Sequence, residues 1–398
     1  MTPLKGLTIL DFSRVLAAPM ATQILAELGA EIIKIERPKS GDESRQWEPT
    51  IPGHPDQSAY FYAFNRGKKS ITLNLKHPHA QTLAKDLARQ SDVLVENFLP
   101  GEMDRMGLSY ETLAAENPKL VYVSNTGFGQ TGPYRDRRGY DTIFQALSGV
   151  MALTGHPGSP PAKVGVPFAD LTAGLWITIG VLAGLAGRGV SGKGAHIDVA
   201  MLDTQVALLT IAAARLWALH EEPGRTGTEH PGRVPSAAFQ CRDGCYLHIS
   251  GSDQHWPATC EVLALPELAA DPTLATNAGR VAARARIMAA MTNAISTRDR
   301  TPLAKALRAR NVPTGEVNSV SDILADPHIQ ARGMVGEFIH PETGPFPALR
   351  LPLRESGAEP PALGTPPVLG ADTDQVLRDR LGLDPAAIAA LRAEGAIG

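Results

Sequence analysis

Apolar residues follow two alternating periods along the first 200 residues of the chain. Short runs rich in Val, Ile and Leu predict buried strands, and between them apolar residues recur three and four positions apart, which predicts amphipathic helices. Strands that alternate with helices are typical of an open α/β fold with a parallel sheet. The predicted strands span 7–12, 31–36, 70–75, 92–98, 120–124 and 195–199, and the predicted helices 19–28, 78–90 and 109–116.

The most apolar uncharged run, 171–187, lies between Asp170 and Arg188. It is slightly too short to cross a bilayer, and Thr172 and Thr178 make it less apolar than a typical membrane span. We therefore interpret this run as a buried core helix and expect no membrane partner.

The pattern changes after residue 220, where Glu, Pro, Gly and Arg predict an exposed connector. Two β-rich runs around an Arg-Asp-Gly turn then predict a hairpin over 237–250, because Gly accepts the left-handed conformation of such turns. Helical patterns follow, so we expect a smaller α+β domain over 225–330. The Pro- and Gly-rich stretch 333–370 predicts an extended strap, and a last helix is expected at 384–394.

The composition and net charge of the chain exclude some classes of partner and compartment. The 398 residues carry a formal net charge of −3, which argues against a nucleic-acid partner held by phosphate neutralisation. Three cysteines form no disulfide framework, and the first residues do not resemble a secretory signal, so we expect a cytoplasmic protein.

Two motifs that suggest a cofactor have the wrong context. The segment 127–132 fits G-x-G-x-x-G, but no helical pattern opens within it to receive a pyrophosphate, so we expect a loop. The Cys and His residues between 241 and 260 lack the paired spacing of a zinc site, so no metal is expected.

Basic residues and one carboxylate remain as candidate chemistry. Several basic residues follow predicted strands, where open α/β sheets bind ligands, and they suit a phosphate-bearing small molecule. They are Lys34, Arg37, Arg66, Lys68, Lys69, Arg105, Arg135, Arg137 and Arg138. Asp170 precedes the buried helix, where it either caps free N–H groups or acts as a nucleophile whose pKa the helix lowers.

Several segments, in matching order and spacing, resemble the class III CoA-transferases, the family of formyl-CoA transferase and carnitine CoA-transferase. The resemblance is carried by the stretches 6–12, 28–38, 95–101, 104–107 and 192–200. It implies a Rossmann-like large domain over 1–220, the small domain over 225–330, and a strap with a C-terminal helix over 331–398 that returns to the large domain. It also implies a homodimer of two chains threaded through each other as interlocked rings.

The resemblance also implies site residues. The family's catalytic aspartate falls on Asp170, and CoA thioesters are substrates with no permanently bound cofactor. The CoA contacts of the family fall on Arg37, Leu73, Asn97, Arg105 and Arg138.

The linker sequence at 226–235 resembles the branch of the family that acts on dicarboxylates. Arg233 is therefore a candidate for binding a distal carboxylate, because a guanidinium binds that group bidentately. Leu16 replaces the glutamine of formyl-CoA transferase, which weakens an assignment to formate and oxalate. We expect succinyl-CoA as the donor and a C4 or C5 dicarboxylate such as glutarate, malate, mesaconate or itaconate as the acceptor.

Two alternatives remain. Racemases of the same superfamily place a histidine where this chain has Tyr140, and a phenol is a poor base at neutral pH. A non-catalytic acyl-CoA sensor would share the fold but would have no use for Asp170.

Overall fold

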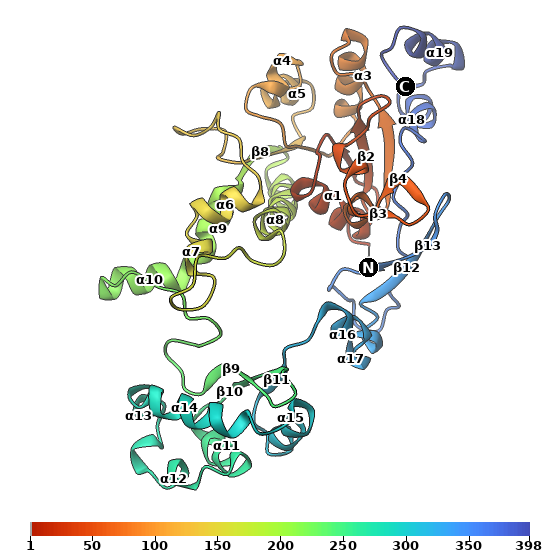
Figure 1. The fold of residues 1–398 in the computed structure, drawn as a ribbon. Coiled ribbons are helices and arrows are strands. Elements are labelled where there is room, and N and C mark those ends of the chain that lie inside the picture. The colour runs from red at the N-terminus through yellow and green to blue at the C-terminus, as the bar shows by residue number, and fades with distance from the viewer. Residues whose placement is uncertain (1) are drawn as a thin grey trace. The chain divides into compact units, whose positions relative to one another are not determined.

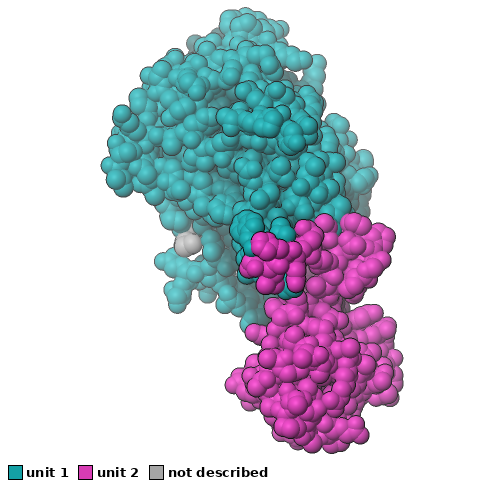
Figure 2. Space-filling view, turned by 90° about the vertical axis from the view of Figure 1, so that its left-hand side faces the viewer, with its two compact units in different colours: residues 1–151, 163–217, 328–398 teal, residues 152–162, 218–327 magenta. Residues whose placement is uncertain are grey.

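The computed structural model describes residues 2–398. The chain divides into two compact units, coloured separately in Figure 2. The first unit comprises residues 1–151, 163–217 and 328–398, and the second comprises 152–162 and 218–327. Residues after 328 therefore pack with the N-terminal part of the chain.

The first unit is built on a six-stranded parallel sheet in the order β5-β2-β1-β6-β7-β8. Figure 1 labels two of these strands, β2 and β8. Its strands are β1 (Thr8–Asp11), β2 (Glu31–Glu36), β5 (Lys68–Thr72), β6 (Val93–Glu96), β7 (Val121–Thr126) and β8 (Ala195–Ala200). All six predicted strands are confirmed, with bounds shifted by a few residues. The chain leaves the sheet centre in opposite directions from β1 and from β6, so the carboxyl ends of these neighbours form a topological switch point, where such sheets bind ligands.

Helices cover both faces of the sheet. Because successive strand residues face opposite sides, Ile9 belongs to one core and Leu10 to the other. On the side of Ile9 lie α1 (Ala17–Glu27) and α8 (Phe168–Ser191). On the side of Leu10 lie α3 (Pro78–Arg89), α4 (Glu102–Arg105), α5 (Tyr110–Glu116), α18 (Thr373–Leu381) and α19 (Pro385–Ala393).

The expected extended strap over 333–370 is wrong in part. It contains an antiparallel hairpin of β12 (Val335–His340) and β13 (Gly344–Leu349). Phe338 packs against Phe61 and Tyr62, and this contact anchors the hairpin. The prolines of β13 obscured the strand in the sequence, although a two-stranded sheet has free edges that tolerate residues without an N–H donor.

Shorter elements connect these layers in the first unit. They are β3 (Thr50–Ile51), β4 (His54–Ser58), α2 (Ala59–Phe64), α6 (Asp141–Leu147), α7 (Val150–Leu153), α9 (Met201–Val206) and α10 (Thr210–Leu219). The last two residues of α7 and of α10 belong to the second unit.

The second unit holds a three-stranded antiparallel sheet in the order β11-β10-β9 and a core of its own. The predicted hairpin is confirmed as β9 (Ser236–Gln240) and β10 (Tyr246–Ser250), and β11 (Thr314–Glu316) joins it. The helices are α11 (Trp256–Leu263), α12 (Pro266–Ala269), α13 (Asn277–Ala282), α14 (Arg284–Ile295), α15 (Arg300–Ala309) and α16 (Val320–Ala325), and α17 (Pro327–Ala331) begins at the unit's end. Cys241 and Cys260 lie in this core.

Gly194 leads into β8 and has no room for a side chain, because a Cβ atom there would lie 1.9 Å from the carbonyl oxygen of Leu120. We expect Gly194→Ala to lower the free energy of unfolding by about 3 kcal/mol, since backbone must shift. Gly187, near the end of α8, meets nothing within 4 Å. Gly187→Ala is the matched control and should be neutral or slightly stabilising in urea denaturation; equal losses from both substitutions would contradict the close approach.

Candidate functional site

A cavity of about 490 Å³ lies at the switch point of the sheet. Its walls come from the loops that follow β1, β6 and β7, from the segment 137–142, and from the start of α8. The lining residues include Arg14, Val15, Leu16, Trp47, Tyr60, Asn97, Phe98, Asn125, Gly127, Arg137, Arg138, Tyr140, Asp141 and Asp170. Residues from distant parts of the sequence thus meet where three parallel strands end.

Five residues expected in the site line this one cavity: Leu16, Asn97, Arg138, Tyr140 and Asp170. Leu16 is buried, whereas the Tyr140 side chain is exposed. The amide of Asn97 is engaged with the main chain of Arg14, accepting from its N–H at 3.0 Å and donating to its carbonyl at 2.8 Å. Asn97 therefore fixes the position of the loop after β1.

Four other expected residues do not line the cavity. Arg37 follows β2 and is exposed, and the side chain of Arg105 is 71% exposed on α4. Leu73 lies in the hydrophobic core, so its side chain has no access to a ligand. Arg233 lies exposed in the second unit, and its role in binding a carboxylate stays a prediction.

Asp170 does not cap α8, so that interpretation of the sequence is wrong. The N-cap residue of α8 is Pro167, without a side-chain hydrogen bond. Asp141, in the first turn of α6, supplies the acceptor instead: its Oδ1 accepts from the N–H groups of Ala169 at 2.7 Å and Asp170 at 3.4 Å. The carboxylate of Asp170 is thus left to face the cavity.

The pKa of Asp170 is raised to about 7, first by burial and then by the negative charge of Asp141. We expected the helix N-terminus to lower this pKa. That expectation is wrong because desolvation and a second carboxylate outweigh the partial positive charge of the helix end.

Two aromatic residues complete the wall, and the sequence showed no signal for either. The ring of Tyr60 packs edge to face on Trp47 with centroids 5.2 Å apart. Burial raises the pKa of Tyr60, and Asp170 and Asp141 raise it further. The phenol therefore stays protonated and can donate a hydrogen bond to a group in the cavity.

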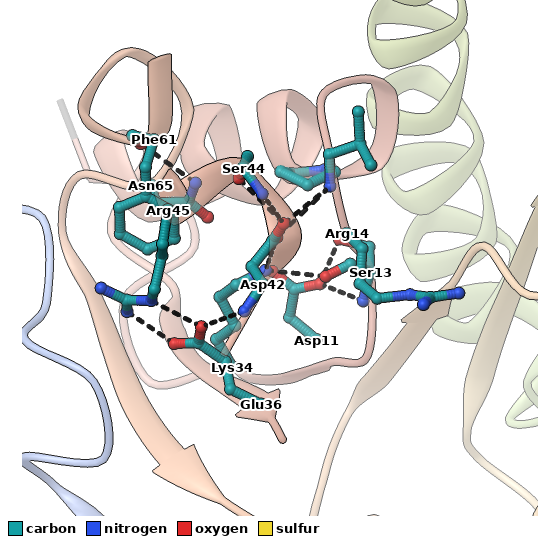
Figure 3. Close-up of polar contacts among 12 residues, drawn as sticks. Asp11, Ser13, Arg14, Lys34, Glu36, Asp42, Ser44, Arg45, Phe61 and Asn65 are labelled. Atoms are coloured by element: carbon teal, nitrogen blue, oxygen red, sulfur yellow. Dashed lines mark hydrogen bonds and ion pairs between the residues drawn. The ribbon is translucent and has the colours of Figure 1, made fainter. Parts of the chain in front are cut away.

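Buried charges lie beneath the loop after β1 (Figure 3). Lys34 Nζ lies 2.9 Å from Asp42, Lys68 Nζ lies 3.1 Å from Asp11, and all four side chains are fully buried. Burial lowers the pKa of Lys68 to about 8, with Asp11 opposing this shift. The expectation that Lys34 and Lys68 hold a phosphate is wrong, because both ammonium groups are paired inside the protein.

This buried network fixes the backbone of the same loop. Lys34 Nζ donates to the carbonyl of Ser13 at 2.7 Å, and the N–H of Val15 donates to both Asp42 oxygens at 3.2 and 3.3 Å. Val15 has a φ of 73°, which is strained for a β-branched residue. Such a conformation persists only where its surroundings over-determine it, so the loop has a defined shape.

The glycine-rich segment 127–132 is a loop, as expected, and the next helix, α6, begins only at Asp141. The N–H of Gln130 donates to Asp198 at 2.7 Å, which ties this loop to β8. Beyond it, the guanidinium of Arg137 lies 3.6 Å from the centroid of the Tyr134 ring. Arg137 and Arg138, which follow this loop, are exposed and line the rim of the cavity.

Asp170→Asn is expected to stabilise the protein more at pH 8 than at pH 4. The protonated carboxyl contributes stability that is complete below the ordinary pKa of 3.8 and lost as pH rises through about 7. Asparagine does not ionise, so its advantage in the free energy of unfolding should grow by roughly 3 kcal/mol over this range in urea denaturation. Asp136→Asn, on an exposed carboxylate, is the control; the same pH dependence in both variants would contradict the raised pKa.

Comparison with known proteins shows which family the chain belongs to. The model of CoA-transferase family III matches residues 4–373. Succinyl-CoA:glutarate CoA-transferase of Mus musculus is 39% identical over 402 residues, covering 100% of this chain and 91% of the relative. Acetyl-CoA:oxalate CoA-transferase of Acetobacter aceti is 41% identical over 334 residues, covering 84% and 85%. The crystal structure of a CAIB/BAIF family protein from Brucella suis has a TM-score of 0.85 at 39% identity, covering 95% of this chain and 99% of that one. The chain belongs to CoA-transferase family III.

Proposed function

We propose that the protein transfers CoA from succinyl-CoA to a C4 or C5 dicarboxylate, such as glutarate, malate, mesaconate or itaconate, with Asp170 as the covalent relay. One observation carries the proposal. The carboxylate of Asp170 lines a cavity at the switch point of the sheet, and it does not cap α8, because Asp141 accepts from the N–H of Ala169. The relative from Mus musculus, named for succinyl-CoA and glutarate, supports the choice of substrates.

The relay consists of two nucleophilic attacks, which transfer CoA to Asp170, followed by their reversal with the acceptor acid. An oxygen of Asp170 attacks the thioester carbonyl, forming an acyl-aspartyl anhydride as the C–S bond breaks and CoA thiolate leaves. The thiolate then attacks the aspartyl carbonyl, which releases the donor acid as a carboxylate and leaves an aspartyl-CoA thioester. The acceptor carboxylate repeats these two steps in reverse, so the energy of the thioester is conserved.

The environment of Asp170 suits this role. A carboxylate whose pKa is raised to about 7 is more basic than an ordinary one, and nucleophilicity rises with basicity. We assign to Tyr60, which lines the cavity and stays protonated, the hydrogen bond to the oxygen that becomes negative during attack. The resemblance assigns Arg37, Leu73, Asn97, Arg105 and Arg138 to contacts with CoA, and of these Asn97 and Arg138 line the cavity.

Asp170→Ala should abolish transfer from succinyl-CoA to glutarate, because no other carboxylate takes over the relay, while CoA binding stays within about threefold of the wild type. New thioesters are identified by mass spectrometry across a panel of acids, and CoA binding is measured by calorimetry. Substantial turnover in this variant would contradict the relay. A wild-type protein that exchanges the α-proton of an acyl-CoA in deuterated water without transfer would be a racemase, and one that only binds CoA would be a sensor.

We also propose that the chain forms a homodimer, of the interlocked type that the resemblance implies, in the cytoplasm. Residues 168–191 and 201–219 are long and apolar enough to cross a membrane. Only 39% of the most apolar 18-residue stretch of the first, and 11% of that of the second, is buried inside the protein. The exposed apolar side chains on these helices include Leu175, Trp176, Ile179, Leu182, Val206, Leu208, Ile211, Leu216 and Trp217. A second copy of the chain would remove this surface from water.

The wild type should therefore elute with the mass of two chains in light scattering after size exclusion. Ile179→Glu places a charge on the 51% exposed face of α8 and should shift the mass toward one chain or cause aggregation. Val320→Glu, on a 75% exposed side chain of the second unit, is the control. A wild-type monomer, or partition of the wild type into lipid vesicles, would contradict the dimer.

A further inference from the structure

Arg14 lies in the wall of the cavity. Its Nε atom is buried and has no hydrogen-bond partner in the described part of the chain. Its Cζ atom lies 4.7 Å from the centroid of the Phe98 ring, so the group stacks on an aromatic wall. A buried donor left unsatisfied costs about 1–3 kcal/mol, which an acceptor on a ligand would remove.

The main chain of Arg14 is held on both sides. Asn97 binds its N–H and its carbonyl, at 3.0 and 2.8 Å. On either side, Lys34 binds the carbonyl of Ser13, and Asp42 binds the N–H of Val15. Figure 3 shows the side chain of Arg14 pointing away from this buried network. The main chain of Arg14 is thus fixed, and stacking on Phe98 restricts its side chain, so a ligand that meets the guanidinium pays less to order the protein.

Apart from Arg14, the cavity disfavours the negative charge of a substrate's distal carboxylate. Asp141 and Asp170 both line it, and after burial their negative charges contribute to the raised pKa of Tyr60. Arg137 and Arg138 also line the cavity, but both are exposed to solvent at its rim. Arg14 is the partly buried cation of the wall, and it offers two parallel N–H donors that match a carboxylate.

We propose that Arg14 binds the distal carboxylate of the acyl group and of the acceptor acid, and thereby selects dicarboxylic over monocarboxylic substrates. This inference rests on the proposed CoA transfer at Asp170 and adds the group that recognises the substrate class. Because the donor acid leaves before the acceptor enters, one guanidinium serves both in turn. The phosphates of CoA are the other anions that could meet Arg14, but their multiple charges suit the exposed arginines outside and at the rim of the cavity.

The first half reaction tests this assignment without any acceptor. Wild-type protein and Arg14→Gln are mixed with succinyl-CoA or butyryl-CoA, which differ by the distal carboxylate on a C4 acyl group, and the enzyme-CoA adduct is followed by mass spectrometry. Arg14→Gln should slow adduct formation from succinyl-CoA about 100-fold, since one partner of a desolvated charge pair is removed. The rate with butyryl-CoA and the affinity for free CoA should stay within about threefold of wild type.

Matched variants complete the design. Arg14→Lys keeps the charge but not the fork of donors, so it should recover only part of the rate with succinyl-CoA. Arg378→Gln removes an exposed arginine of α18 that does not line the cavity and should match the wild type. Arg233→Ala tests the other candidate for the same carboxylate, and a loss selective for succinyl-CoA there but not in Arg14→Gln would overturn the assignment.

The outcomes separate this inference from the proposed function. Equal losses with both acyl-CoAs, together with weaker binding of free CoA, would place a phosphate at Arg14 and overturn the inference while transfer stands. Unchanged rates in Arg14→Gln would overturn it as well. If the wild type forms no adduct with either acyl-CoA, the proposed function itself fails.

Discussion

Two ion pairs buried beneath the carboxyl ends of β1 and β2 determine the shape of the loop on which the cavity depends. Lys34 pairs with Asp42 and Lys68 pairs with Asp11, and none of the four side chains reaches water. Loss of one partner would leave a buried charge that costs about 3–5 kcal/mol. Apolar residues could fill such a volume at less cost, so the network is better explained by the backbone that it holds at Val15 than by net stability.

The cavity follows from strand order more than from any single motif. Parallel strands with both faces covered are continuous apolar runs, and their polar residues begin where the strands end. Arg14 comes three residues after β1 and Asn97 comes one residue after β6. Because β1 and β6 are neighbours from which the chain departs in opposite directions, these two residues meet and bind each other through the main chain of Arg14.

The sequence predicted elements that depend on local pattern and missed features that depend on distant partners. Apolar runs located all six strands of the sheet, and the family resemblance identified Asp170 and Leu16, which share the cavity. Charge alone did not distinguish Lys34, which is sealed inside the protein, from an exposed basic residue. Arg14 lies in a short loop without periodicity, so only its neighbours in space reveal it.

The start of α8 also depends on a residue that is distant in the sequence. A helix N-terminus with an aspartate predicts a cap, but the capping carboxylate comes from Asp141, 29 residues away in sequence from Asp170. No local pattern encodes such a partner.

Asp141 also links two properties that most proteins can vary separately. Its oxygen fixes where α8 begins, and its charge makes the neighbouring Asp170 more basic. Replacing it by a neutral residue would lower that basicity, and removing its oxygens would release the first turn of the helix. Evolution can therefore adjust the reactivity of Asp170 through this neighbour only within the limits that helix geometry allows, and adaptation to a new pH is expected to proceed through other residues of the wall.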